Sequence, residues 1–243
     1  MSSTSEKGLA KTLGNFNSLI SFCTGYGSKY VPSHKALEVP QLQALHLNAK
    51  GQLALVHTAA GTNATAINQR QLVFEPLKDR ANKVVYSLAS SGADDKIIAD
   101  AKTINRKIQG TSLAKPKIPA DAQAAADPKN VSTSQQSFDS VLDNFDKLVK
   151  LVSAEPMYKP NETELTLAGL NTFITAMNAS NQAVIDSTTT VSNARITRNN
   201  VLFAEPDGLV PIADAVKLYL RSIFKVSSPE YKQVSKLQFP KSA

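Results

Sequence analysis

The 243-residue chain contains no tryptophan and a single cysteine, Cys23. One thiol excludes an internal disulfide and any metal site built from several thiolates. Cys23 falls on a leucine-rich stripe, so we expect a buried, inert thiol and not a nucleophile. The sequence also lacks G-x-S-x-G, H-E-x-x-H and Walker patterns. These absences leave few ways to pair a nucleophile with a base.

Long apolar runs are missing as well. No stretch approaches the ~18 consecutive apolar residues that a membrane-spanning helix needs, so we expect no membrane partner. The first residues, MSSTSEKGLAKTLG, lack the apolar segment of a secretory signal, and the expected location is the cytoplasm. Hydrophobic residues make up 42% and charged residues 19% of the chain, a composition typical of a folded protein with an aliphatic core.

The net charge of +7 is unevenly distributed along the sequence. Residues 1–110 hold 13 Lys and Arg against 7 Asp and Glu, whereas residues 138–243 hold 11 of each. The lysines of the first part are scattered, and no basic run interleaved with aromatic residues accompanies them. We expect a solvated basic surface, with weak, salt-sensitive nucleic-acid binding as the alternative.

Two parts of the sequence repeat each other about 128 residues apart. YVPSHKALEV at 30–39 matches YKPNETELTL at 158–167, and LGNFNSL at 13–19 matches LDNFDKL at 142–148. So many matches in one order indicate two copies of one unit. The predicted organisation is a first helical repeat, a linker rich in Pro, Ala and Ser, and a second helical repeat, at residues 1–110, 111–137 and 138–243.

The apolar periodicity of each copy is helical, and strand patterns are nearly absent. In the second copy, apolar residues recur at steps of three and four between Phe138 and Val152. Asp143 and Asp146 each precede a lysine by four residues, which supports the outer face of that helix. The other short helices are expected at 9–23, 77–89, 94–108, 209–225 and 229–238, the last with Ser228 as its cap and Pro229 at its first position.

A hinge followed by a long helix is predicted in each copy. Asn161 and Glu164 match an N-x-x-E capping pattern, so the long helix of the second copy is expected over 162–204. In the first copy, Pro40 delays the start to about Glu38. The predicted fold is all-α, with two related helical-bundle repeats, each containing one long central helix, in an elongated molecule. The buried side of the second long helix is expected to include Thr188 and Arg195.

Two sequence patterns could indicate a ligand site, but neither meets the requirements of one. His46 and His57 share one helical face but lie ~16 Å apart along the axis, too far for one zinc ion. TGYGSKY at 24–30 lacks the third glycine of a dinucleotide fingerprint. We therefore assign no catalytic residue, cofactor or metal ligand.

Several polar residues recur in both copies, and they are the candidates for a site. They are Arg70 with Glu75, Arg198 with Glu205, and Asn15 with Asn144. An arginine and a carboxylate at the end of each long helix suit a paired binding site across a pseudo-two-fold axis. The commoner use of such residues is helix punctuation and ion pairs between neighbouring helices. The two asparagines are expected to cap helices or to fix the bundle.

Residues 193–237, from NARITRNN to SKL, resemble a bacterial family of internally duplicated helical proteins of unknown function, as does the YKPNETEL entry to the long helix. The resemblance implies an all-α fold and carries no catalytic residue, cofactor or partner. From the residues, we predict a non-enzymatic structural or protein-interaction protein that forms a homo-oligomer or binds a protein partner. The alternative is a nucleic-acid-associated protein that binds through its basic first repeat, and an enzyme or small-ligand carrier has the least support.

Overall fold

The computed structural model describes residues 4–110 and 136–240, so residues 111–135 of the predicted linker lie outside the described part. Over the described residues the protein has eight α-helices, two short 3₁₀ turns and no strand, which confirms the all-α prediction. None of the helices in these ranges is long and apolar enough to cross a membrane. The elements are α1 (Thr4–Gly25), η1 (Gly27–Lys29), η2 (Lys35–Leu37), α2 (Val39–Phe74), α3 (Leu77–Ser90), α4 (Asp95–Gln109), α5 (Phe138–Ser153), α6 (Leu167–Phe203), α7 (Leu209–Ile223) and α8 (Pro229–Ser235).

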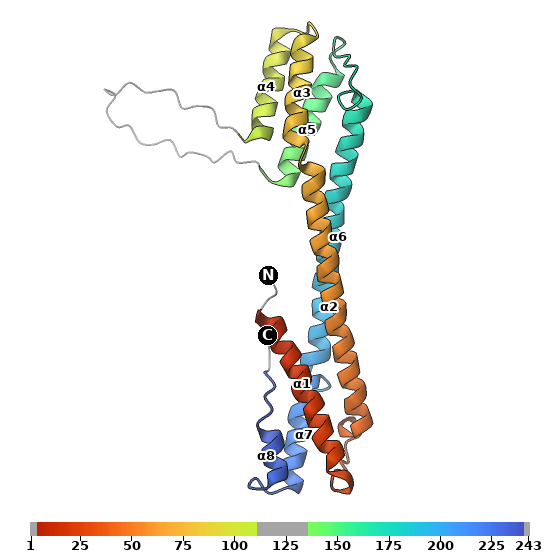
Figure 1. Cartoon of the computed structure of the whole chain (residues 1–243), viewed down its shortest axis with the longest axis vertical. Helices are drawn as coiled ribbons and strands as arrows, with labels where there is room; N and C mark the ends of the chain where they lie inside the picture. Colours follow the sequence, from red (N-terminus) through yellow and green to blue (C-terminus); the bar gives the residue numbers. More distant parts are fainter. Residues whose placement is uncertain (1–3, 111–135, 241–243) are drawn as a thin grey trace, which may run out of the picture. The chain divides into compact units, whose positions relative to one another are not determined.

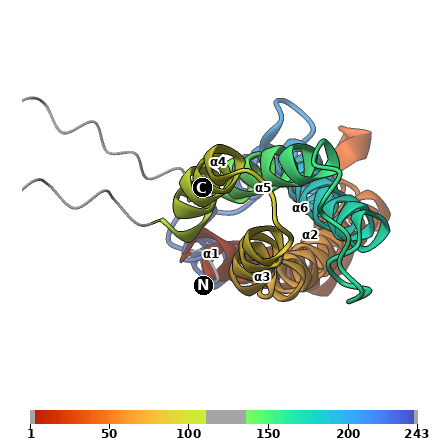
Figure 2. The same ribbon diagram turned by 90° about the horizontal axis from the view of Figure 1, so that it is seen from above.

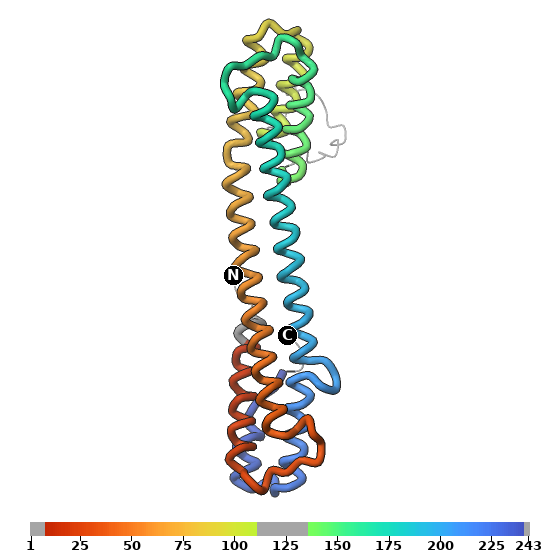
Figure 3. Tube along the Cα trace, turned by 90° about the vertical axis from the view of Figure 1, so that its right-hand side faces the viewer, coloured from red at the N-terminus to blue at the C-terminus, as the bar shows by residue number. Residues whose placement is uncertain are grey.

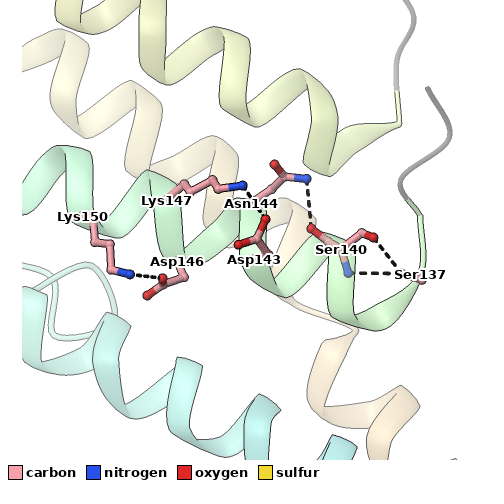
Figure 4. A network of polar contacts seen from close by, with 7 residues as sticks. All are labelled: Ser137, Ser140, Asp143, Asn144, Asp146, Lys147 and Lys150. Atoms are coloured by element: carbon pink, nitrogen blue, oxygen red, sulfur yellow. Dashed lines mark hydrogen bonds and ion pairs between the residues drawn. The ribbon is translucent and has the colours of Figure 1, made fainter. Parts of the chain in front are cut away.

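Local capping explains where several helices begin. The Ser228 hydroxyl accepts a hydrogen bond from the Tyr231 amide at 3.2 Å, and Pro229 occupies the first turn of α8, as predicted. Ser137 caps α5 in the same way through the Ser140 amide at 3.1 Å (Figure 4). A side-chain oxygen thus satisfies a helical amide that has no partner within the helix.

The outer face of α5 carries the ion pairs expected from the sequence. Lys147 pairs with Asp143, and the Lys150 ammonium lies 2.6 Å from Asp146 (Figure 4). Asn144 sits on the opposite, buried side and donates to the Ser140 carbonyl at 2.9 Å. Exposed pairs of this kind contribute little, about 0.3–0.5 kcal/mol each, so packing of the apolar face stabilises α5.

The start of α6 differs from the prediction. The helix begins at Leu167, and the Thr166 hydroxyl accepts a hydrogen bond from the Gly169 amide at 3.1 Å, so the expected start at Glu162 with Asn161 as the cap is wrong. Glu164 lies 3.1 Å from the Lys83 ammonium and 3.7 Å from the Arg80 guanidinium of α3. The Glu164 carboxylate thus faces two cations of α3, and the Thr166 hydroxyl takes the capping role that the pattern assigns to Asn161.

The chain divides into two compact units that each draw on both sequence repeats. Unit 1 comprises residues 1–63 and 187–243, and unit 2 comprises residues 64–186. Both long helices contribute to both units, because α2 passes residue 63 and α6 passes residue 187 without a break. The contacts therefore group the helices differently from the sequence division at 110 and 138.

Unit 1 is built from α1, the first part of α2, the last part of α6, α7 and α8 (Figure 1). The largest buried side chains of its core are Phe16, Leu19, Leu42, Leu202 and Leu220. Within this unit, α2 and α6 run antiparallel (Figure 3). The core thus joins the N-terminal helix to the helices at the other end of the chain.

Unit 2 is built from the last part of α2, α3, α4, α5 and the first part of α6, which lie around its core (Figure 2). The large buried side chains include Leu88, Ile108, Phe145, Leu148 and Met177. Phe145 packs edge-on against Phe173, with ring centroids 5.6 Å apart. The edge-to-face arrangement places the positive edge of one ring on the negative face of the other.

The same buried hydrogen bond occurs once in each unit. The Tyr30 hydroxyl donates to the Leu37 carbonyl at 2.6 Å, and the Tyr158 hydroxyl donates to the Leu165 carbonyl at 2.9 Å. Both bonds close the hinge that precedes a long helix. A buried tyrosine normally finds such a partner, because an unpaired hydroxyl in the core costs about 1–3 kcal/mol.

The buried sides of α2 and α6, here called the seam, contain polar residues among the apolar ones. The Ser187 hydroxyl donates to Asn63 at 2.9 Å in unit 1, and the Asn181 amide donates to Asp139 at 2.9 Å in unit 2. Ser187 is buried, whereas Thr188 and Arg195 are exposed, so including the last two in the seam was wrong. The packed positions of α6 in this region are 184, 187, 191, 194 and 198, spaced by three and four residues. Thr188 and Arg195 each lie one residue beyond a packed position, which turns them about 100° away from the seam.

Replacing either of two glycines in the long helices by alanine should change the free energy of unfolding, in opposite directions. A β-carbon at Gly169 would lie 2.1 Å from the Thr163 carbonyl oxygen, whereas one at Gly51 would contact nothing within 4 Å. We expect Gly169→Ala to lower the free energy of unfolding by about 1–3 kcal/mol through this clash. Gly51→Ala should raise it by about 1 kcal/mol, because alanine is the better helix former. Urea unfolding followed by circular dichroism measures both, and equal effects of the two changes would contradict the described start of α6.

Candidate functional site

Arg70 lies near the end of α2 and joins it to α5. Its guanidinium carbon is 4.1 Å from the centroid of the Phe138 ring, and that ring packs edge-on against Phe74 with centroids 4.9 Å apart. The buried Nε of Arg70 has no hydrogen-bond partner, so the aromatic face supplies its main electrostatic contact. Glu75 is exposed after the helix end, and no ion pair connects it to Arg70 in the described part of the chain.

Arg198 has a different environment. It is buried on α6 in unit 1, and its Nε and Nη2 donate to the Asn199 side-chain oxygen at 3.1 and 2.9 Å. Glu205 is exposed beyond the end of that helix. The two arginines therefore share a sequence position in the repeats, but they belong to different units and contact different groups.

The two recurring asparagines also have different roles. Asn15 on α1 donates to the Gln238 carbonyl at 2.9 Å, which ties α1 to the segment after α8. Asn144 is buried and bonds within its own helix, α5. Asn15 thus connects distant parts of unit 1, and Asn144 satisfies a polar group beside the core of unit 2.

His46 and Cys23 lie beside and within the core of unit 1, whereas His34 and His57 are exposed. His46 on α2 lies near the Phe16 ring, with centroids 6.4 Å apart, and burial, reinforced by Lys50, lowers the His46 pKa. Cys23 is buried, as predicted, and burial raises the pKa of its thiol to about 11. Residues 4–110 and 136–240 include no group of three or more His, Cys, Asp or Glu placed to hold a metal ion.

A groove between α2 and α6 in unit 1 is the best candidate for a binding surface. It has a volume of about 580 Å³, and its α2 wall consists of Gln52, Leu55, Thr58, Ala59 and Thr62. Its α6 wall consists of Ser187, Thr190, Asn193, Ala194 and Thr197. Seven of the ten lining residues are Ala, Ser or Thr, the others are Gln52, Asn193 and Leu55, and none is charged. The Leu55 side chain is 57% exposed. Small residues on two adjacent helices leave room for another side chain or helix to approach closely.

The groove was not predictable from the sequence. It requires the antiparallel pairing of two helices that are more than a hundred residues apart in the sequence. The recurrence of Thr, Ala and Ser at three- and four-residue steps beside the seam was visible in both helices, but such residues are equally common on an exposed helix face.

The two units differ sharply in net charge. Unit 1 holds 13 Lys and Arg against 6 Asp and Glu, an excess of +7, and unit 2 holds 14 of each. The positive charge that the sequence assigns to the first repeat is thus shared, in the structure, between the two ends of the chain. A charge of this size on one unit favours an acidic partner there and opposes close approach of charged surfaces from a second copy.

No protein-family model, no curated protein and no solved structure matches this chain. The resemblance drawn from residues 193–237 stays a prediction. The groove and the charge of unit 1 are therefore the observations from which a function can be argued.

The stacking of Arg70 can be tested against its sequence neighbour. We expect Arg70→Ala to lower the free energy of unfolding by about 1–2 kcal/mol, because it removes the contact with Phe138 and the packing of the arginine stem. Glu75→Ala should change it by less than about 0.5 kcal/mol, because Glu75 is exposed. Chemical unfolding of both variants checks the difference, and an equal loss for Glu75→Ala would indicate a functional pairing that the contacts do not show.

His46 makes the stability of unit 1 depend on pH. Its pKa is lowered in the folded protein, so folding favours the neutral ring and stability falls as the pH drops below about 6.5. In His46→Gln this loss should be smaller between pH 8 and pH 5. Unfolding midpoints of the parent and the variant at both pH values measure the effect, with His57→Gln, at an exposed position, as the matched control. Identical pH profiles for the parent and His46→Gln would show that the ring is solvated.

Proposed function

We propose that the protein is a non-enzymatic helical scaffold that self-associates, with the α2–α6 groove of unit 1 as the contact between two copies. The observation that carries the proposal is an uncharged, small-residue groove on a unit whose net charge is +7. Two copies with this charge repel each other unless they meet through a neutral face. The groove is such a face.

The chemistry of the groove suits an identical partner. Leu55 is the one large apolar residue among the ten that line the groove, so a two-fold arrangement lets each leucine enter the other copy's hollow between Ala59 and Ala194. Threonine and asparagine side chains offer both donors and acceptors, which a second set of the same residues satisfies. An isologous contact of this type closes on itself and produces a dimer.

The composition of the seam also supports burial of the groove by a second copy. Beside the groove, α2 and α6 bury Ser187 next to Asn63, so this part of their contact is partly polar. Polar residues at seam positions fix alignment at a cost in stability. Burial of the groove on dimerisation offsets that cost with additional apolar contact.

We further infer that the two sequence repeats descend from one helical unit. The matching tyrosine bonds, Tyr30 to Leu37 and Tyr158 to Leu165, support this inference, as do the buried Phe16 and Phe145 at equivalent positions. Each unit then takes the first helix of one repeat and the last two helices of the other. A protein with this arrangement resembles a dimer whose two chains have become one.

The proposal is tested by placing a charge in the groove. We expect Leu55→Glu to shift the mass measured by light scattering from two copies of the 26.1 kDa chain to one, because a carboxylate would be buried at the contact. Thr197→Glu on the opposite wall should weaken association by about tenfold or more for the same reason. Leu72→Glu is the matched control, since Leu72 lies on the same helix, is 61% exposed and belongs to unit 2.

Circular dichroism melting of each variant verifies that it remains folded. A parent protein that is monomeric at all concentrations would contradict the proposal. So would a dimer that Leu55→Glu and Leu72→Glu weaken equally, because the contact would then lie outside the groove.

A further inference from the structure

Two segments from opposite ends of the sequence meet at one end of unit 1. The Tyr30 and Tyr219 rings lie 5.4 Å apart, and the Val31 amide donates to the Tyr219 hydroxyl at 3.2 Å. The Tyr26 and Phe224 rings lie 5.1 Å apart. The connection between α1 and α2 and the connection between α7 and α8 therefore form one surface, which Figure 1 shows at the end of the unit where α1 stops.

This surface exposes aliphatic side chains that the core does not use. The exposed fractions are 71% for Val31, 39% for Ile223 and 57% for Val226. Two aromatic residues of the same connections, Tyr26 and Phe224, are half-buried and pack against each other. Exposed apolar residues are ordinary when scattered, but a group held in place by packed rings is typical of an interaction surface.

Cations lie among the same residues. Lys29 and Lys225 line a hollow of about 570 Å³ together with Ser227 and Ser228. Arg221 is exposed in the last turn of α7. The acidic group at this hollow is Glu230, whose carboxylate lies 3.8 Å from the Lys29 ammonium, so the surface retains an excess of positive charge. We call Lys29, Val31, Ile223, Lys225 and Val226 the end patch.

We propose that the end patch binds the surface of an anionic phospholipid bilayer. Valine and isoleucine side chains enter the boundary between head groups and acyl chains, and the lysines contact the phosphate oxygens beside them. The Ser227 and Ser228 hydroxyls at the hollow offer further donors for those oxygens. The expectation of no membrane partner rests on the lack of a spanning segment, which a surface contact does not need.

The composition of the patch favours a lipid surface over the other acidic or apolar partners. Nucleic acid gains nothing from exposed aliphatic side chains, and the aromatic rings near the patch, which could stack on bases, pack against one another instead. A second copy of the chain would bring lysine against lysine. Apolar side chains mixed with cations match the two layers of an anionic bilayer surface.

Co-sedimentation of the full chain with vesicles tests the proposal. We expect binding to vesicles of phosphatidylglycerol and phosphatidylcholine in equal amounts, and little binding to phosphatidylcholine alone. The affinity should fall by about fivefold for each of Lys29→Gln and Lys225→Gln, and it should fall with added salt. Val226→Ser with Ile223→Ser should weaken binding at any salt concentration, because the apolar contribution is not screened.

Matched controls lie in unit 2. Lys147→Gln with Lys150→Gln removes two exposed, ion-paired lysines, and Leu72→Ser removes an exposed leucine. These variants should bind vesicles as the parent does. Leu55→Glu should also bind normally, so failure of the dimer proposal and failure of this proposal are distinguishable.

Three results would overturn the proposal. The first is no binding to phosphatidylglycerol vesicles at low salt, and the second is equal binding by the patch variants and the parent. The third is a loss of affinity for a DNA oligonucleotide, with vesicle binding unchanged, in Lys29→Gln and Lys225→Gln. That outcome would assign the patch to nucleic acid.

Discussion

The structure depends on covering the apolar seam of two very long helices. α2 has 36 residues and α6 has 37, and each buries one side along much of its length. The short helices α3 and α4 have only 14 and 15 residues, so neither can cover the full length of a helix of 36 or 37 residues. Each long helix therefore packs with different short helices in the two units, and this requirement determines which parts of the chain meet.

Polar residues on the seam turn general apolar packing into a defined alignment. Asn63 meets Ser187 in unit 1, and Asn181 meets Asp139 in unit 2. A slip of either long helix by one turn would separate the buried Ser187 and Asn181 side chains from these partners, at about 1–3 kcal/mol each. Apolar contacts alone would discriminate less between neighbouring alignments, because leucine and valine pack acceptably at several of them. Because the alignment of α2 and α6 is defined, the groove beside the seam has a defined shape.

Helix positions were predictable because their causes are local. Pro76 and Pro206 mark the ends of the long helices, and Ser228 with Pro229 marks the start of α8. The start of α6 was not predictable, because Glu164 is drawn away by Arg80 and Lys83, which are some 80 residues distant. A capping pattern takes account only of residues within the helix itself, whereas here contacts with α3 determine where α6 begins.

The site residues were harder to predict for the same reason. The sequence identifies Arg70 and Arg198 as equivalent, but the first stacks on Phe138 and the second bonds Asn199. The end patch was not predictable, because its residues come from the α1–α2 connection and from the end of α7 onward, which meet only when α1 and α7 share a core. Counting charges along the chain cannot show that residues 187–243 join residues 1–63 in one unit of net charge +7.

The interlaced use of the two repeats has a consequence for how the chain can be divided. Neither half of the sequence contains a complete core, because Leu42 and Leu202 share one core while Phe74 and Leu170 share the other. A truncation near the middle, chosen as though it separated two domains, would open both interiors at once. The two halves supplied as separate polypeptides would have to recognise each other in order to fold, so the covalent link sets their effective concentration and not their architecture.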